Sequence, residues 1–497
     1  MHTLDSVPAT QLLTGGSLAL IPQRVEGWGM AVGGEARVFR PTDAEGVRAA
    51  LTCARAEGTR IALRGSGCSY GDGACGTGKI VIDFRDMNRI LAFDAQTGVI
   101  RVEAGATLRD VWQRSLPEGW WPPVVSGTME PTLGGALGMN LHGKNAHRAG
   151  PIGKYVTSLK VMFANGEVRD LTPDGDPDLF HAIVGGFGEL AIILEAELHL
   201  KRVYSGQIEV LGLASTHLDE LFAQFREHEA DSDYLVGWID GFAGGKSLGR
   251  GLIHVAWQIK EGVDPDPKTS TSLAGQQLPS RLFGVFPKRW MWAAMWPFSF
   301  NLGMRMVNWA KYVSGRVLEH GKKYRQSHAA FHFLLDYVPN WKWAYKPGGL
   351  IQHQSFVPHA NAPAAFREII AHTQKCGMPT WLAVMKRHRA DPFLMTHGLD
   401  GYSMAMDFHV TKSNRARLWA MCHELDAIVV KHGGRFYFAK DATLEPKSVL
   451  AAFPRENLLK FAAFRKELDP DGVLATDLYD RVIAPALRLL DADPGPT

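Results

Sequence analysis

Two glycine-rich stretches about sixty residues apart constrain this chain more than any other feature. The first runs from Arg64 to Asp72 (Arg-Gly-Ser-Gly-Cys-Ser-Tyr-Gly-Asp), and the second runs from Ser126 to Asn145. Because glycine permits positive φ and close approach to the backbone, such loops can direct several N–H groups at a pyrophosphate. The first stretch lies between two short strand patterns, 61–63 and 80–84. A Rossmann turn must open a helix, so the sequence predicts another kind of nucleotide cradle.

Composition limits the classes of protein to which the chain can belong. Of its 497 residues, 46% are hydrophobic and 21% are charged, which is typical of a globular protein with two or three domains. A net charge of +3 and the lack of a recognisable nucleic-acid-binding motif indicate no nucleic-acid partner. Five cysteines lie far apart, at 53, 68, 75, 376 and 422. That spacing suits neither a disulfide framework nor zinc, so we expect a reducing compartment and no metal.

Hydrophobic periodicity divides the chain into three blocks, which we take as domains: 1–203, 204–432 and 433–497. Asp43 is the predicted N-cap of a helix that runs through Arg55. Further spacing patterns predict a helix over 108–114 and strands over 99–103, 190–200, 252–257 and 402–408. The last block begins with one strand and continues as helices.

Seven motifs occur in a recognisable order along the chain. They are Arg64-Gly-x-Gly-x-Ser-Tyr-Gly-Asp72, His142-Gly-Lys-Asn145, Leu171-Thr-Pro173, Val184-Gly-Gly186, Gln352-x-Gln354, Gly433-Gly-Arg-x-Tyr-x-Ala-Lys-Asp441 and Leu468-Asp-Pro470. This order resembles the vanillyl-alcohol-oxidase (PCMH-type) family of FAD-binding oxidoreductases, over about residues 25 to 485 and weakly between 205 and 335. Within that family it is most similar to the decaprenylphosphoryl-β-D-ribose 2′-oxidase group, which oxidises a lipid-linked ribose.

The resemblance implies an α+β fold in which a two-part FAD-binding domain holds an inserted α+β substrate domain, an antiparallel sheet with helices. The final segment would return to the FAD domain. The residues that the resemblance assigns to FAD binding are Arg64, Gly65, Ser66, Gly67, Cys68, Ser69, Tyr70, Gly71, Asp72, Gly127, Thr132, Leu133, Gly134, Gly135, Met139, Asn140, His142, Ile192 and Tyr437. Covalent members of the family carry a histidine at the position of Cys68. A thiolate there could attack the flavin methyl group, but a small residue in a tight turn is the simpler interpretation, so we expect non-covalent FAD.

Lys440 and His142 are the candidate catalytic residues. Alternation along a predicted strand would place Phe436, Phe438 and Lys440 on one face. An ammonium group at Lys440 could stabilise negative charge on the reduced flavin or bind the substrate hydroxyl. In the resembling family the segment that matches His142 lines the flavin, whereas a histidine taken by itself is more often structural.

Four further residues are predicted to bind substrate alongside Lys440: Lys144, Gln352, Gln354 and Lys386. Period two places both glutamines on the same face of an apolar strand, where their amides could hold sugar hydroxyls. Paired surface glutamines are the alternative. Where members of the resembling group carry a cysteine, this chain has Ala405, which indicates a differently shaped pocket.

The stretch 290–304 holds fifteen residues without a charge, five of them aromatic. It is shorter than the roughly 20 apolar residues that span a bilayer, and Pro297 interrupts it. Cations on both sides leave two interpretations, a helix or lid packed on the substrate domain, or peripheral membrane contact through 288–325. The first six residues hold no basic region before an apolar block. We therefore expect no secretory signal and a cytoplasmic location, either free or peripheral at the inner membrane.

Together these features predict an FAD-dependent oxidoreductase that acts on CH–OH groups by hydride transfer to flavin N5. The expected substrate is a sugar joined to a polyprenyl phosphate and oxidised at its 2′-hydroxyl, with a separate reductase or electron acceptor as partner. A soluble alditol or aldonolactone is one alternative substrate. Reduction of a lipid or sterol C=C bond is another reaction open to such a fold, and flavin binding without turnover is the non-enzymatic alternative.

Overall fold

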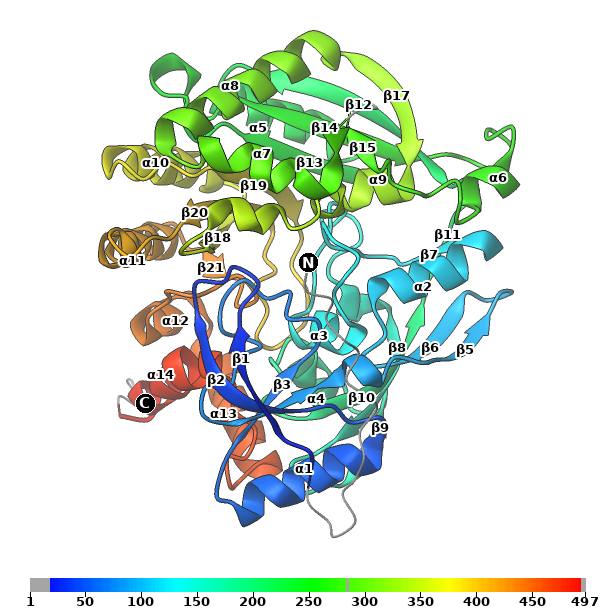
Figure 1. The fold of residues 1–497 in the computed structure, drawn as a ribbon, viewed down its shortest axis with the longest axis vertical. Coiled ribbons are helices and arrows are strands. Elements are labelled where there is room, and N and C mark those ends of the chain that lie inside the picture. Colours follow the sequence, from blue (N-terminus) through cyan, green and yellow to red (C-terminus); the bar gives the residue numbers. More distant parts are fainter. Residues whose placement is uncertain (1–17, 283–285, 493–497) are drawn as a thin grey trace.

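The computed structural model describes residues 18–282 and 286–492. The chain forms two lobes, one above the other in Figure 1. The lower lobe contains both the N-terminal and the C-terminal parts of the chain, and the upper lobe contains the segment between them. The predicted α+β architecture with an inserted middle segment is confirmed.

The lower lobe begins with a four-stranded sheet in the order β1-β2-β4-β3. The elements are β1 (Ile21–Glu26), β2 (Gly33–Phe39), α1 (Ala44–Ala56), β3 (Ile61–Arg64) and β4 (Ile80–Asp83). Asp43 caps α1 as predicted, because its carboxylate accepts the Gly46 N–H at 2.8 Å. The first glycine-rich stretch connects β3 to the parallel strand β4 with no helix between them. This confirms the strand–loop–strand pattern.

A five-stranded antiparallel sheet follows in the order β5-β6-β10-β8-β9. The elements of this part are β5 (Ile90–Asp94), β6 (Val99–Glu103), α2 (Leu108–Ser115), β7 (Trp120–Trp121), α3 (Leu133–Gly138), β8 (Val156–Met162), β9 (Val168–Leu171), α4 (Pro177–Ile183), β10 (Ile192–His199) and β11 (Lys201–Arg202). The short helix α3, formed by the second glycine-rich stretch, packs across β6 and β10. Both glycine-rich stretches are therefore supported by sheets of the lower lobe.

The upper lobe is built on an eight-stranded antiparallel sheet in the order β17-β12-β14-β13-β19-β20-β18-β21. Its strands are β12 (Gln207–Ser215), β13 (Tyr234–Ile239), β14 (Gly251–Gln258), β17 (Lys322–Ser327), β18 (Leu350–Pro358), β19 (Leu382–His388), β20 (Gly401–His409) and β21 (Arg435–Phe436). The other elements of the lobe are α5 (Leu218–His228), α6 (Pro267–Thr271), β15 (Arg281–Leu282), β16 (Phe286–Pro287), α7 (Met291–Met295), α8 (Asn301–Leu318), α9 (His328–His332), α10 (Ala362–Lys375) and α11 (Arg415–Lys431).

The two faces of this sheet carry different helices. Ile253 and Val255 of β14 pack in the same core as Leu221 of α5, whereas Leu252 packs against Tyr312 of α8. Because successive side chains of a strand point to opposite faces, α5 and α8 cover opposite faces of the sheet. Helices α10 and α11 pack on each other, and α10 also contacts α5.

The C-terminal segment returns to the lower lobe, where Figure 1 shows its helices beside β1 and β2. Its helices are α12 (Pro446–Ala452), α13 (Arg455–Leu468) and α14 (Ala484–Ala492). Leu474 forms a β-bridge to Ile61 of β3, and Asp477 accepts a hydrogen bond from Lys79 at 3.0 Å. The C-terminal segment therefore packs on the N-terminal part of the chain, and the domain bounds 1–203, 204–432 and 433–497 remain a prediction.

Two details near residue 433 differ from the expectation. The upper sheet takes its last strand from β21, which pairs with β18, so the sheet continues past the boundary expected at 432/433. The predicted strand through Lys440 is wrong, because β21 ends at Phe436 and a turn follows. Backbone hydrogen bonds from Lys440 to Tyr437 and from Asp441 to Phe438 close that turn.

Candidate active site

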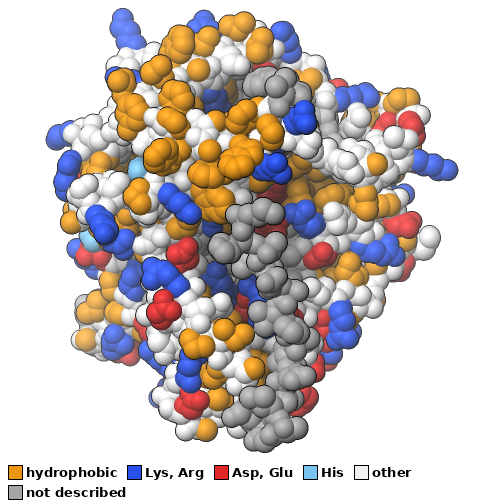
Figure 2. Space-filling model, viewed as in Figure 1, with side chains coloured by type: hydrophobic (Ala, Val, Ile, Leu, Met, Phe, Trp, Pro, Cys, Tyr) orange, Lys and Arg blue, Asp and Glu red, His pale blue; other side chains and the backbone are white. Residues whose placement is uncertain are grey.

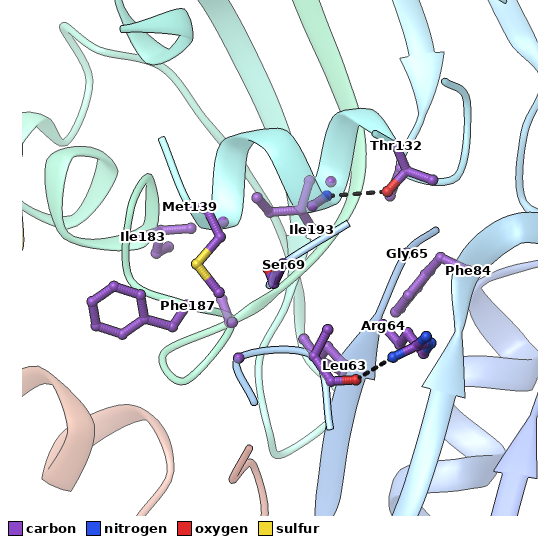
Figure 3. Close-up of a pocket in the computed structure, with 18 residues that line it drawn as sticks. Leu63, Arg64, Gly65, Ser69, Phe84, Thr132, Met139, Ile183, Phe187 and Ile193 are labelled. Carbon is purple, nitrogen blue, oxygen red and sulfur yellow. Dashed lines mark hydrogen bonds between the residues drawn. The ribbon is translucent and has the colours of Figure 1, made fainter. Parts of the chain in front are cut away.

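Both glycine-rich stretches line one narrow slot in the lower lobe (Figure 3). Arg64 and Gly65 enter it from the end of β3, and Thr132 and Gly135 enter it from the start of α3. Thr132 caps α3 by accepting the Gly135 N–H at 3.3 Å, which Figure 3 shows as a dashed line. The N–H groups of Leu133 and Gly134 donate to the Ala106 and Ala104 carbonyl oxygens at 2.7 and 2.8 Å, so the start of α3 is fixed against the loop that follows β6.

The glycines of the slot pass a simple steric test for a nucleotide cradle. A Cβ atom at Gly65 would lie 2.0 Å from Thr132 Oγ1, and one at Gly71 would lie 1.5 Å from the Asp441 carbonyl oxygen. Gly67 has a φ of 67°, where other residues are strained. These positions require glycine for backbone packing, and the residues present fit a bound dinucleotide.

The structure places the residues predicted to bind FAD in two sets. Those that line the slot are Arg64, Gly65, Ser69, Thr132, Gly134, Gly135 and Met139. Those that do not line it are Ser66, Gly67, Cys68, Tyr70, Gly71, Asp72, Gly127, Leu133, Asn140, His142 and Tyr437. At the start of β10, Ile193 and the preceding residue Ala191 line the slot and the predicted Ile192 between them does not, as alternation requires.

Cys68 has the character of an unreactive thiol. Burial raises its pKa to about 12, with a smaller contribution from Glu130, although Lys440 acts in the opposite direction. A thiol with such a pKa is protonated at neutral pH, and the thiolate is the nucleophilic form. The environment of Cys68 therefore favours non-covalent cofactor binding.

The sheet of the upper lobe turns one face of β18 toward the lower lobe. Gln352 donates a hydrogen bond to Asp407 on β20 at 2.5 Å, and Gln354 lies 3.1 Å from His142 Nε2. The intervening His353 pairs with Asp426 of α11 at 2.9 Å. The two glutamines thus share a face, as the alternation predicted, and both are buried rather than at the surface.

Lys440 lies at the junction of the two lobes. Its Nζ is 3.6 Å from the centre of the Tyr70 ring, which belongs to the first glycine-rich stretch. Burial lowers the pKa of Lys440 to about 7, although the carboxylate of Asp407 opposes that shift. Burial likewise raises the pKa of Asp407 to about 7. The two groups form a buried acid–base pair that titrates near neutral pH.

Three lysines gather around this junction, of which Lys144 is buried and Lys386 and Lys440 are partly buried. Burial lowers the pKa of Lys144 to about 7 and that of Lys386 to about 8, and the charge of Lys386 further lowers the pKa values of both Lys144 and Lys440. Lys144 donates to the Phe331 carbonyl oxygen. Among the residues that the structure describes, none of the three lysines forms an ion pair within 4.0 Å. Largely desolvated cations without a carboxylate within ion-pair distance favour an anionic ligand.

His142 belongs to a group of aromatic side chains above the slot. Its ring lies 5.1 Å from that of Tyr437, 4.9 Å from that of His388 and 5.3 Å from that of His397. Burial, followed by the charge of Lys386, lowers its pKa well below the usual value, so the ring is neutral. If Gln354 donates to Nε2, the Nδ1–H is a buried donor with no partner in the described structure. That orphan donor is available to a ligand oxygen.

Sequence reasoning missed four residues of this site. Asp407 and Ser403 lie on β20, and His388 on β19 bonds to Ser403 at 2.8 Å. Arg481 donates to Asp72 at 2.6 Å and to Asp441 at 2.6 Å, so it joins the first glycine-rich stretch to the Lys440 turn. An acid inside the apolar run 402–408 was an available signal for Asp407. Arg481 had none, because its partners Asp72 and Asp441 lie 409 and 40 residues away, beyond the reach of a local pattern.

One group of potential metal ligands lies away from the junction, on α10 and α11. His372 Nε2 is 2.6 Å from a Glu424 carboxylate oxygen and 3.5 Å from Cys376 Sγ. The hydrogen bond to Glu424 already accounts for this arrangement without an ion. The expectation that the protein holds no metal remains a prediction.

Comparison with known proteins agrees with this geometry. A family profile described as "FAD binding domain" matches residues 36–172, and one described as "D-arabinono-1,4-lactone oxidase" matches residues 353–482. Decaprenylphosphoryl-beta-D-ribose oxidase of Mycolicibacterium smegmatis is 33% identical over 470 residues, which are 93% of this chain and 97% of that protein. The chain belongs to this family of FAD-dependent oxidases. As a family member it is an oxidoreductase that acts on CH–OH groups of sugar-like substrates with FAD as cofactor.

More distant relatives share only part of the chain. L-gulonolactone oxidase of Bos taurus is 30% identical over 160 residues, which are 32% of this chain and 36% of that protein. A putative D-arabinono-1,4-lactone oxidase of Neurospora crassa is 29% identical over 157 residues, 32% of this chain and 28% of that protein. The similarity to the ribose oxidase therefore extends through the upper lobe, whereas similarity to these lactone oxidases covers about a third of the chain.

Proposed function

We propose that the protein oxidises a secondary hydroxyl of a pentose that is joined to a polyprenyl phosphate, at the 2′ position of the sugar. The observation that supports this most strongly is the group of three lysines without ion-pair partners, Lys144, Lys386 and Lys440, at the junction of the lobes. A phosphate would supply the negative charge that these cations lack. The similarity to the mycobacterial ribose oxidase along 93% of the chain supports the same substrate class.

The residues around the junction suggest how the reaction is assisted. Gln352 and Gln354 present amides that can hold sugar hydroxyls, and the His142 Nδ1–H can donate to a ligand oxygen. The Lys440 ammonium stabilises negative charge that develops on the substrate oxygen, and the Asp407 carboxylate accepts the hydroxyl proton. Bound FAD supplies the acceptor for the hydride that leaves the carbinol carbon, so that the product is a ketone.

A soluble aldonolactone is the second candidate substrate. The match of residues 353–482 to the arabinonolactone oxidase profile favours it, because this segment includes Gln354, Asp407 and Lys440. A lactone carries no phosphate, however, and so would leave Lys144 and Lys386 without a counter-charge. The two candidates therefore differ in how much they depend on these two lysines.

Lysine replacements can distinguish the candidates. Lys144→Met and Lys386→Met should each raise KM for a polyprenyl-phosphoryl pentose by about tenfold or more, because a charge-assisted hydrogen bond contributes about 1.5–3 kcal/mol. The matched control is Lys201→Met, since Lys201 is already paired with Asp233 at 3.3 Å. Unchanged KM values in both test variants, with efficient oxidation of a lactone, would contradict the proposal.

A further inference from the structure

Helix α8 exposes an apolar stripe on the face that points away from the protein. Leu302, Met306, Trp309, Val313 and Val317 recur at helical spacing, and their exposed fractions range from 36% to 67%. The opposite side of the helix is also occupied, because Met304, Asn308 and Tyr312 are buried against the sheet. A surface helix ordinarily turns polar residues to solvent, so the outer stripe is unusual.

The stripe continues into the segment that precedes α8. Large exposed side chains there are Phe286, Trp290, Trp296, Phe298 and Phe300. We call the exposed apolar residues from Phe286 to Leu318 the α7–α8 surface. Figure 2 shows hydrophobic side chains gathered over the upper lobe, where α7 and α8 lie in Figure 1. Isolated exposed apolar residues are normal, but a contiguous patch indicates an interaction surface.

The charges around this surface have one sign. Residues 286–318 contain no Asp or Glu, and α8 itself carries Arg305, Lys311 and Arg316. At 100° per residue, Arg305 and Arg316 flank the apolar stripe on one side. The nearest acid in sequence, Glu319, already lies 3.1 Å from His254. The net positive charge is complementary to an anionic partner.

A recess of about 320 Å³ opens beside the stripe. Its walls are Asp240, Phe242, Arg250, Arg305, Met306 and Trp309. Asp240 is neutralised by Arg250, whose guanidinium group donates to it at 2.7 Å. Arg305 is exposed and forms no ion pair within the described residues, so the recess holds one uncompensated cation beside three apolar side chains. Such a combination suits a phosphate-bearing lipid headgroup.

The α7–α8 surface lies next to the proposed substrate site. Met304 on the inner side of α8 belongs to an apolar cluster with Trp341, Tyr345 and Tyr70. The Tyr70 ring is the one that Lys440 contacts. α8 covers the sheet face that carries Lys386. Residues paired across neighbouring strands share a face, and Lys386 pairs with Val236, which pairs with His254. His254 lies two residues beyond Leu252, the β14 residue that packs on α8, and so is on the same face. Apolar side chains thus connect the outer surface to the pocket.

We propose that the α7–α8 surface docks on an anionic lipid bilayer. The helix would lie in the interfacial plane, with Trp290, Trp296 and Trp309 among the headgroups and Arg305 and Arg316 at lipid phosphates. No helix in the described part of the chain has the length and apolarity to cross a bilayer. The inference rests on the proposed function in one respect: docking here would bring a membrane-held polyprenyl chain to the pocket. Lys288 lies in the segment 288–325 that was expected to contact the membrane. It is not part of the proposed lipid contact, because it is buried against the Tyr337 ring.

Vesicle binding by the FAD-loaded protein tests the proposal. Sedimentation would be measured with vesicles of phosphatidylcholine alone and with one-third phosphatidylglycerol, without any substrate. Leu302→Glu/Val317→Glu should lose at least tenfold in binding to the anionic vesicles. Arg305→Gln and Arg316→Gln should each lose about fivefold, the equivalent of about 1 kcal/mol per cation. Binding should also weaken as salt rises from 0.1 M to 1 M, because the screening length falls from about 10 Å to 3 Å.

The control adds the same charge elsewhere. Val263→Glu/Leu459→Glu replaces side chains that are 50% and 43% exposed outside the surface, and it should bind vesicles as the unaltered protein does. An unchanged flavin spectrum would establish that each variant is folded. Equal vesicle binding by the Leu302/Val317 and control variants would overturn the proposal. The proposal would also be overturned by a different result: the unaltered protein self-associates in light scattering, the Leu302/Val317 variant is monomeric, and neither protein binds vesicles. Failure to oxidise a lipid-linked pentose would contradict the proposed function and leave these binding results standing.

Discussion

Replacement of Lys440 by alanine should slow substrate-driven flavin reduction by a hundredfold or more while FAD remains bound. The partly buried Lys440 ammonium lies over the Tyr70 ring at 3.6 Å, where water can replace it only poorly. Loss of one preorganised donor at a developing negative charge costs about 100- to 1,000-fold, or roughly 3–4 kcal/mol. FAD should be retained, because Arg64 and the α3 N-terminus line a separate part of the site.

The pH dependence gives this prediction a second, independent readout. With a pKa of about 7, Lys440 loses its proton as pH rises through neutrality. If the protonated form is active, the unaltered protein should lose about tenfold in rate per pH unit well above that pKa, and Lys440→Ala should lack this decrease. Lys323→Ala is the matched control, since Lys323 contacts the Trp257 ring at 5.0 Å on β17, the edge strand of the upper sheet, and should leave the rate within about twofold. Stopped-flow flavin bleaching without oxygen measures both effects. Normal reduction by Lys440→Ala would refute the reasoning.

Three further predictions concern the acid–base pair, the clamp between segments and the cofactor. Asp407→Asn should slow flavin reduction. The Asp407 carboxylate raises the pKa of Lys440, so its removal should lower that pKa and move the alkaline decrease in rate to lower pH. A decrease at higher pH would contradict the pairing. Arg481→Met should lower the free energy of unfolding by about 3 kcal/mol, because it leaves the carboxylates of Asp72 and Asp441 without their ion-pair partner. The control Arg60→Met breaks an exposed ion pair and should lower it by less than about 1 kcal/mol. Denaturant titrations measure both values. Acid denaturation should release all FAD from the polypeptide, and flavin retained on the chain would show that Cys68 forms a bond.

Local sequence patterns predicted much of the lower lobe correctly. The cap at Asp43, the strand 99–103 and the helix over 108–114 all follow from short-range periodicity and side-chain capping, and all are observed. The shared face of Gln352 and Gln354 was predicted for the same reason, since alternation depends only on the strand itself.

Features that depend on distant contacts could not be predicted in the same way. Alternating apolar residues favoured a strand through Lys440, but β21 pairs with β18 only as far as Phe436, and the chain then turns to meet Tyr70. The partners of Arg481 lie in two other segments, which no local pattern connects. The sequence left two interpretations of the stretch 290–304, a packed helix or a membrane contact. The structure shows that one side of the stretch is packed and the other is exposed.

The central claim is that the protein oxidises a pentose whose phosphate is held by the lysines at the junction of the lobes. The most direct measurement is anaerobic mixing of the FAD-loaded protein with a polyprenyl-phosphoryl ribose and with the same glycoside lacking the phosphate, followed at the flavin absorbance and by analysis of the product. The account predicts rapid bleaching by the phosphorylated compound with formation of its 2′-ketone, and bleaching at least tenfold less efficient without the phosphate. Equal bleaching by both compounds, or bleaching by a free aldonolactone alone, would contradict it.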